Sequence, residues 1–183
     1  MDAFEQVVCE ILWMNGYWVR SSVKVDLTKE EKRLIRRPSS PRWELDIVAY
    51  QGATNTLTVV ECKSYIDSVG VRASAFDGSD PSHAARYKLF NEQDLRAIVF
   101  DRLAAQLSET KTCRPNPTIR LALACGKIKN KSDRESLHEL SEKQNWILWD
   151  ERWLREQLEK LATQSYENQV ASVVSKLIFR TGN

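Results

Sequence analysis

Two acidic residues and one lysine lie near the ends of two neighbouring strand-like segments. The segment ELDIVAY carries Asp46, and the segment TLTVVECKSY carries Glu61 and Lys63. Side chains alternate across a strand, so Glu61 and Lys63 share one face while Cys62 faces the other way. If the turn between the segments has an even number of residues, Asp46 lies directly opposite Glu61. An odd turn or a bulge would move Asp46 diagonally or off that face.

Two carboxylates this close repel each other unless a cation lies between them. Oxygen ligands of this kind suit Mg²⁺ or Mn²⁺ rather than zinc. A divalent ion can neutralise a phosphate, lower the pKa of a bound water and orient its attack. A nearby lysine can stabilise the charge that develops or position the water, and it can act as a base only if its pKa is depressed. These residue types therefore indicate metal-dependent phosphodiester hydrolysis.

The same residues resemble the pattern of the PD-(D/E)XK, or restriction-endonuclease-like, nucleases. That pattern has an acidic residue in an early helix, an aspartate on one strand and E-x-K on the next. Here Asp46, Glu61 and Lys63 match it, and the helical acid would be Glu5. The similarity covers about residues 1–125.

This resemblance implies an α/β/α sandwich, Mg²⁺ or Mn²⁺ as cofactor and a nucleic-acid substrate. It also implies the main-chain carbonyl of Cys62 as an extra metal ligand. Leu45 stands where the family name has proline, and the segment 66–90 fits no particular subfamily. The metal set expected from the resemblance is therefore Asp46, Glu61 and the Cys62 carbonyl, with Glu5 beside them.

The E-x-K motif and Glu5 each have an alternative explanation that involves no catalysis. The E-x-K motif alone is weak evidence for an active site, because alternating charges on a strand usually lie on a solvent-exposed face. Here Glu61 and Lys63 follow an apolar run, LTVV, and a second carboxylate lies on the partner segment. For Glu5 the alternative is an exposed acid that the helix dipole favours near an N-terminus.

The rest of the chain predicts one α/β domain over residues 1–183. Its core covers about 1–125, and a strand and helices extend it over about 126–183. Asp2 and Gly16 bound a first helix, in which Glu5 sits at the rim of the apolar stripe and Glu10 points away. We expect further helices from Asn91 to about Thr110 and over 132–144, 150–164 and 167–179, and strands over 17–25, 44–50, 56–65, 118–125 and 146–149.

Between these elements, residues 26–43 form a polar connection that Pro38 and Pro41 keep irregular, and 66–90 forms a long loop. The element order indicates a central mixed sheet with helices on both faces and extra helices at the C-terminal end. Trp146, Trp149 and Trp153 have the spacing of core residues rather than of base-stacking platforms.

A run of positive charge precedes the Asp46 segment. Residues 28–42 carry four more positive than negative charges, whereas the whole chain has a net charge of +2. A basic element beside the active site could hold phosphates and set the register on a duplex. The alternative is a solvated helical turn with pairs such as Glu30 and Arg33. The expected nucleic-acid-binding residues are Lys29, Lys32, Arg33, Arg36, Arg37 and Arg42.

The remaining composition narrows the class of protein. Four dispersed cysteines and two histidines argue against a zinc site and favour a reduced, cytoplasmic protein. The start of the sequence shows no secretory pattern, and no apolar run approaches the roughly 18 residues that span a bilayer.

We therefore expect a nuclease, most plausibly an endonuclease, with DNA favoured over RNA as partner and with no membrane partner. A homodimer is one assembly open to it. An RNA-cleaving enzyme, and an inactive nucleic-acid-binding or scaffold protein with the same fold, are the alternatives.

Overall fold

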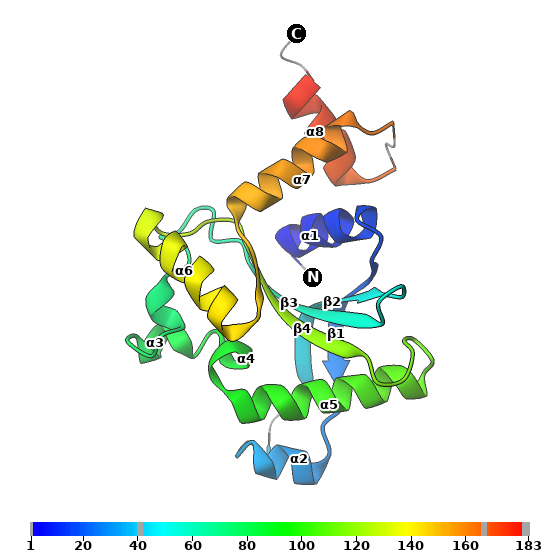
Figure 1. Cartoon of the computed structure of the whole chain (residues 1–183), viewed down its shortest axis with the longest axis vertical. Helices are drawn as coiled ribbons and strands as arrows, with labels where there is room; N and C mark the ends of the chain where they lie inside the picture. Colours follow the sequence, from blue (N-terminus) through cyan, green and yellow to red (C-terminus); the bar gives the residue numbers. More distant parts are fainter. Residues whose placement is uncertain (1, 40–41, 166–167, 181–183) are drawn as a thin grey trace.

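A five-stranded mixed sheet lies between helices on both of its faces in the computed structural model, which describes residues 2–39, 42–165 and 168–180 (Figure 1). The strands are β1 (Trp18–Val25), β2 (Trp43–Gln51), β3 (Thr56–Lys63), β4 (Thr118–Cys125) and β5 (Ile147–Trp149). They lie in sequence order across the sheet. The pairs β1–β2 and β2–β3 are antiparallel, whereas the pairs β3–β4 and β4–β5 are parallel. The predicted α/β class and mixed sheet are confirmed.

Helix α1 (Ala3–Met14) covers one face of the sheet. It begins at a capping box, in which the Asp2 carboxylate accepts from the backbone of Glu5 and the Glu5 carboxylate accepts from the backbone of Asp2. Its buried residues Val8, Ile11 and Leu12 complete an apolar stripe at helical spacing. The sheet meets this stripe with Ile47, Ala49, Val60, Cys62, Ala122 and Ala124.

Helix α5 (Gln93–Glu109) covers the opposite face with Leu95, Val99, Leu103 and Leu107. The predicted N-cap, Asn91, is wrong, because Glu92 occupies that position and makes no side-chain cap. The Asn91 amide instead donates to the carbonyls of Ala75 at 2.9 Å and Ala84 at 3.1 Å. Its side chain therefore ties the preceding segment together rather than starting the helix.

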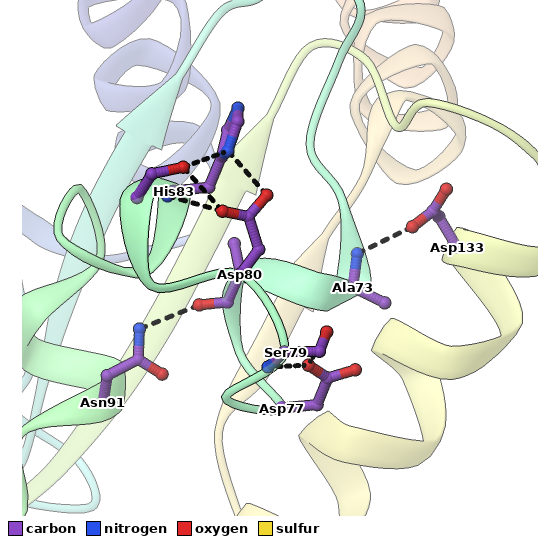
Figure 2. A network of polar contacts seen from close by, with 9 residues as sticks. Ala73, Asp77, Ser79, Asp80, His83, Asn91 and Asp133 are labelled. Carbon is purple, nitrogen blue, oxygen red and sulfur yellow. Dashed lines mark hydrogen bonds and ion pairs between the residues drawn. The ribbon is translucent and has the colours of Figure 1, made fainter.

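The segment 66–90, predicted as one long loop, contains three short helical pieces. They are η1 (Ala73–Ala75), α3 (Pro81–Ala84) and α4 (Lys88–Asn91). Figure 2 shows what fixes them: Asp133 accepts from the backbone of Ala73 at 2.8 Å, and Asp80 caps the first turn of α3 at His83. Each piece is about one turn long, which is too short to give a periodic apolar pattern.

The connection 26–43 also holds a helix that the sequence did not predict as an element, α2 (Lys29–Leu34). Thr28 and Glu31 form its capping box. The Glu31 carboxylate also accepts from Arg102 of α5 at 2.7 Å, and this ion pair holds α2 against α5. Figure 1 places α2 beyond α5, on the side away from the sheet.

The C-terminal part joins the core instead of standing apart from it. Strand β5 pairs with β4, and Trp146 and Trp149 are both buried. Trp153 stacks on Trp149 with ring centroids 4.9 Å apart, so these three tryptophans are core residues, as predicted. The helices of this part are α6 (Lys131–Gln144), α7 (Glu151–Thr163) and α8 (Val170–Arg180). Helices α7 and α8 lie over α1 (Figure 1).

Glu10, which the helical wheel places away from the apolar stripe of α1, contacts helix α8. Its Oε2 accepts from the backbone N–H of Ala171 at 2.6 Å, and its Oε1 accepts from Gln6 at 3.2 Å. Backbone N–H groups in the first turn of a helix have no partner within that helix. The sequence of α1 alone could not predict this contact, because it does not show that α8 packs beside Glu10.

We expect Glu10→Ala to lower the free energy of unfolding by about 1 kcal/mol, because the first turn of α8 loses a charged acceptor. Thermal or urea unfolding monitored by circular dichroism measures the change. Glu139→Ala, at an exposed position in α6, is the matched control and should change stability by under about 0.5 kcal/mol. Equal stability of the two variants would contradict a capping role for Glu10.

Candidate active site

The β2–β3 hairpin sets the position of Asp46 relative to Glu61. Its turn holds the four residues 52–55, and the pairing runs from Gln51 with Thr56 to Ile47 with Val60. The turn is therefore even, and one further step of the same register sets Asp46 against Glu61. The pairing stops before that step, so β2 and β3 separate at Asp46.

The Asp46 carboxylate occupies the place where the strands separate. Its Oδ2 accepts from the backbone N–H of Cys62 at 2.8 Å. Strand N–H groups point sideways toward the neighbouring strand, so the carboxylate lies between β2 and β3 rather than above either face. It is thus beside the backbone that joins Glu61 to Lys63.

A break in side-chain alternation accounts for this sideways orientation. Leu45 packs in the core on the α5 side, whereas Ile47, two residues later, packs in the core on the α1 side. Pairing between β1 and β2 also skips one position, Ser22 with Asp46, and Ser22 has a positive φ of 50°. The sequence did not reveal the break, because apolar residues occupy both faces of this part of β2. The one sequence feature that marks the position of the break is the pair Ser21 and Ser22 in the middle of β1.

Glu61 and Lys63 form an ion pair on the α5 side of the opening. The Lys63 Nζ lies 2.5 Å from Glu61 Oε1, and both side chains are about one-fifth exposed, at 20% and 21%. The Lys63 Nζ also lies 5.9 Å from the ring centroid of Tyr87, a distance at which a cation is attracted to the ring face.

Tyr87 is a site residue that the sequence did not predict. It is buried, and its ring packs against Phe76 with centroids 4.4 Å apart. A second ring, that of Phe90, lies with its centroid 6.4 Å from that of Tyr87. These contacts hold the Tyr87 ring in place near the Lys63 ammonium group. No pattern around Tyr87 could have identified it, because it lies between α3 and α4, each of which is a single turn.

Burial and nearby acids raise the pKa of Glu61 and of Glu5. Burial is the main cause that raises the pKa of Glu61; Lys63 opposes it, and Asp46 and Glu5 add to it. The pKa of Glu5 is raised by burial first and then by Asp46 and Asp2. Three acids therefore share one region of the protein with one ammonium group, an excess of negative charge that a cation would relieve.

Lys63 is a cation in this arrangement. Burial by itself would lower its pKa, but the Glu61 carboxylate, its hydrogen bond and Asp46 together raise the pKa above its usual value. A lysine with a raised pKa stays protonated at neutral pH. Of the three roles open from the sequence, general-base catalysis is therefore disfavoured, which leaves charge stabilisation and positioning of the water.

Glu5 and Cys62 each have a structural task as well as a place near the site. Glu5 Oε2 accepts from the backbone of Asp2 at 3.2 Å and so caps the first turn of α1. The Asp46 carboxylate also raises the pKa of Glu5, and Glu5 in turn raises the pKa of Glu61. The Cys62 side chain is buried, and burial raises the pKa of its thiol, which leaves it neutral. A side-chain thiolate ligand at this position is therefore disfavoured.

Two of the six basic residues are engaged by acids of this chain. Arg37 Nη2 lies 2.8 Å from Glu92, and the Arg37 guanidinium lies 5.5 Å from the ring centroid of Trp43. Arg42 Nε lies 2.6 Å from Asp26. The other four, which form no ion pair within the described residues, are exposed or half-buried on α2 and the turn after it: Lys29, Lys32, Arg33 and Arg36.

The carboxylates of Asp46 and Glu61 are the side-chain ligands that the resemblance implies for Mg²⁺ or Mn²⁺. Within the described residues, no group of three or more His, Cys, Asp or Glu side chains is arranged to hold a metal ion. Mg²⁺ does not need such a group, because it keeps several waters and binds through one or two carboxylates plus substrate phosphates. Asp46 and Glu61 each direct one carboxylate oxygen to a donor of this chain, which leaves a second oxygen on each. The donor chemistry fits Mg²⁺ or Mn²⁺.

Comparisons with known proteins supply no relative: no family model, no curated protein and no solved structure matches the chain. The nuclease resemblance stays a prediction from the residues themselves. Among the helices of the described residues, none is long and apolar enough to span a bilayer. All four cysteines are free thiols, and both histidines contact acids, His83 with Asp80 and His138 with Asp150.

The hydrogen bond to Asp46 makes a prediction about stability. We expect Asp46→Ala to lower the free energy of unfolding by about 1–2 kcal/mol, because the buried N–H of Cys62 loses its acceptor. Asp46→Asn keeps a carbonyl acceptor and removes a charge that Glu61 and Glu5 repel, so it should be at least as stable as the parent. Denaturant unfolding of both variants measures the difference. A drop of the same size in both would show that the charge, not the hydrogen bond, is what matters.

Proposed function

We propose that this protein is a metal-dependent nuclease that hydrolyses phosphodiester bonds in DNA, with Asp46, Glu61 and Lys63 at its centre. The observation that supports this proposal is the Asp46 carboxylate at the opened end of β2 and β3, next to the Glu61–Lys63 pair. Two acids and an ammonium group in one place are what phosphodiester hydrolysis needs. The mixed sheet between helices supports a restriction-endonuclease-like α/β/α sandwich as the finer fold.

Asp46, Glu61 and the main-chain carbonyl of Cys62 would hold Mg²⁺ or Mn²⁺, with Glu5 beside them. When bound, the ion supplies charge neutralisation at the phosphate and a water of lowered pKa. The Cys62 N–H fixes the orientation of Asp46, and Lys63 fixes that of Glu61. Lys63, which is protonated, donates to a phosphate oxygen as negative charge develops there, and the Tyr87 ring keeps its ammonium group in position.

The substrate class follows from the surface that leads into β2. The four basic residues on and after α2 that pair with no described acid can contact successive phosphates of a nucleic-acid backbone without reading its sequence. We propose that the protein cuts DNA at internal phosphodiester bonds and that it does so in the cytoplasm. RNA is a close variant, because the metal chemistry does not distinguish the two sugars.

A second candidate is a nucleic-acid-binding scaffold that lacks turnover. The lack, among the described residues, of three or more His, Cys, Asp or Glu side chains arranged to hold a metal ion favours it. The Glu61–Lys63 pair would then be a largely buried structural ion pair. Binding of Mn²⁺ separates the two candidates, because the nuclease needs it and the scaffold does not.

We expect the protein to nick circular plasmid DNA in Mg²⁺ or Mn²⁺ and to be inactive in a chelator. Asp46→Asn, Glu61→Gln and Lys63→Met should each lower the cleavage rate by about 10²-fold or more, because each removes charge from the reacting centre. Glu44→Gln and Lys24→Met, at exposed positions on β2 and β1, are matched controls that should cut like the parent. Gel assays on single- and double-stranded DNA and RNA give the rates.

Wild-type inactivity on all four substrates, with no Mn²⁺ uptake in calorimetry, would leave the scaffold as the better proposal. If Lys63→Met cuts as fast as the parent, the assignment of Lys63 is wrong even where the activity is real.

We expect Arg33→Glu with Arg36→Glu to weaken binding to duplex DNA and to flatten its dependence on salt, by about 0.9 in log–log slope for each phosphate that the protein no longer neutralises. The physical reason is that fewer counterions are released from the duplex. Fluorescence anisotropy at several salt concentrations measures the slope. Lys143→Glu, exposed near the end of α6, has the same charge change per residue and serves as control. An unchanged slope in the α2 variant would assign those arginines to solvent.

A further inference from the structure

Helix α8 has its polar and apolar sides in the reverse of the usual arrangement. Its buried residues are Ala171, Ser172, Ser175 and Lys176. Its large aliphatic side chains are instead exposed, with exposed fractions from 41% to 65%: Val170, Val173, Val174, Leu177 and Ile178. We call these five residues the α8 stripe. A surface helix of a monomer normally turns such a stripe toward its own core.

The α8 stripe is a concentration of exposed apolar surface. Ten large hydrophobic residues are exposed among the described residues, and five of them lie on this one helix. Single exposed aliphatic residues are ordinary, but a contiguous patch marks a surface that contacts something else.

An apolar groove continues the patch toward α1. It encloses about 260 Å³, and the stripe residues Val170, Val174 and Ile178 form one wall. Ala3 and Val7 of α1 form the facing wall. The surface available to a partner is therefore a helix with a groove along its side.

The chemistry of α8 selects among the occupants of this surface. A helix that lies on a membrane carries Lys and Arg on its polar face, and a nucleic-acid contact needs positive charge. On α8 the single exposed charged side chain is that of Arg180, at its end. The occupant is consequently an uncharged apolar surface of a protein.

The spacing of the stripe indicates which protein surface fits. Its residues follow one another at i, i+3, i+4, i+7 and i+8, the spacing with which two helices pack along a common seam. Residues at this spacing are complementary to a second helix of the same kind, and a two-fold axis brings the same patch of two subunits together.

We propose that two copies of this chain associate through their α8 stripes and form a two-fold symmetric dimer. The helix is 11 residues long, so the seam is about 16 Å long. A stable interface uses roughly 20–30 residues on each side, and this surface is smaller. The dimer is therefore weak and forms in a concentration-dependent way.

This proposal does not rest on the nuclease proposal. Helices α8 and α2 lie at opposite ends of the long axis of the molecule (Figure 1). Pairing through α8 leaves the basic residues of α2 uncovered, so each copy can contact a nucleic acid while the two copies stay joined.

Sedimentation and light scattering over concentrations up to about 200 μM, the range that reveals weak dimers, test the proposal. We expect the mass to rise from 21.1 kDa toward twice that value. Val174 is the middle residue of the stripe, so its two copies lie nearest the two-fold axis. Val174→Glu and Val174→Lys should each be monomeric, because like charges meet at the axis, and an equimolar mixture of the two should dimerise again.

Val69→Glu introduces the same charge at an exposed aliphatic residue outside α8 and should dimerise like the parent. Ile178→Glu repeats the test at a second stripe position, and circular dichroism checks that each variant is folded. The proposal is overturned by a parent that stays monomeric at every concentration, by Val174→Glu and Ile178→Glu dimers as tight as the parent's, or by a Glu/Lys mixture that stays monomeric.

Discussion

The hydrogen bond from the Cys62 backbone to the Asp46 carboxylate is the contact on which the arrangement of the site depends. Two antiparallel strands normally satisfy each other's backbone groups. Here the pairing of β2 with β3 ends at Ile47, so the strands separate at Asp46, and the side chain of Asp46 takes the place of a backbone acceptor. A buried N–H without an acceptor is costly, so this opening is stable because an aspartate stands at that position. One carboxylate thus keeps the sheet open and places negative charge in the opening.

The negative charges around this opening destabilise the folded protein, and neighbouring side chains reduce that cost. Burial and mutual repulsion raise the pKa of Glu61 and Glu5, which means that the folded protein holds these carboxylates at a cost. Lys63 offsets part of that cost, and the Tyr87 ring holds Lys63 from the other side. Strain of this kind is typical of sites that bind a further charge. The short helical pieces of the segment 66–90 belong to the same arrangement, because they carry Tyr87 and Phe76.

The two ends of the molecule present different surfaces. At one end α2 is attached to α5 through Glu31 and Arg102 and displays positive charge. At the other end α8 is attached to α1 through Glu10 and displays aliphatic side chains. Both attachments are made by acids whose partners are far away in the sequence. The positive charge of α2 and the apolar surface of α8 are therefore separated along the long axis (Figure 1).

The sequence by itself determined the long elements and the hairpin. Apolar residues at helical spacing predicted α1 and α5, and two strand-like segments around a short turn predicted the pairing of β2 with β3, which extends to Ile47 with Val60, one step short of Asp46 with Glu61. These features depend on local periodicity, which a single chain segment carries in full. The sequence also predicted Asp46, Glu61 and Lys63 as members of one site, because their spacing on two neighbouring strands can be read from the sequence.

Tertiary structure decided the rest, because each remaining feature depends on a partner that is distant in the sequence. The sideways orientation of Asp46 follows from a break in β1 at Ser22, and the support of Lys63 follows from Tyr87. The ion pair of Arg37 with Glu92 likewise joins two residues that lie 55 positions apart in the sequence. The direction of the α8 stripe is likewise fixed by how α8 packs on α1 and α7. Periodicity gives the stripe of a helix, but only packing determines whether that stripe faces the core or the solvent.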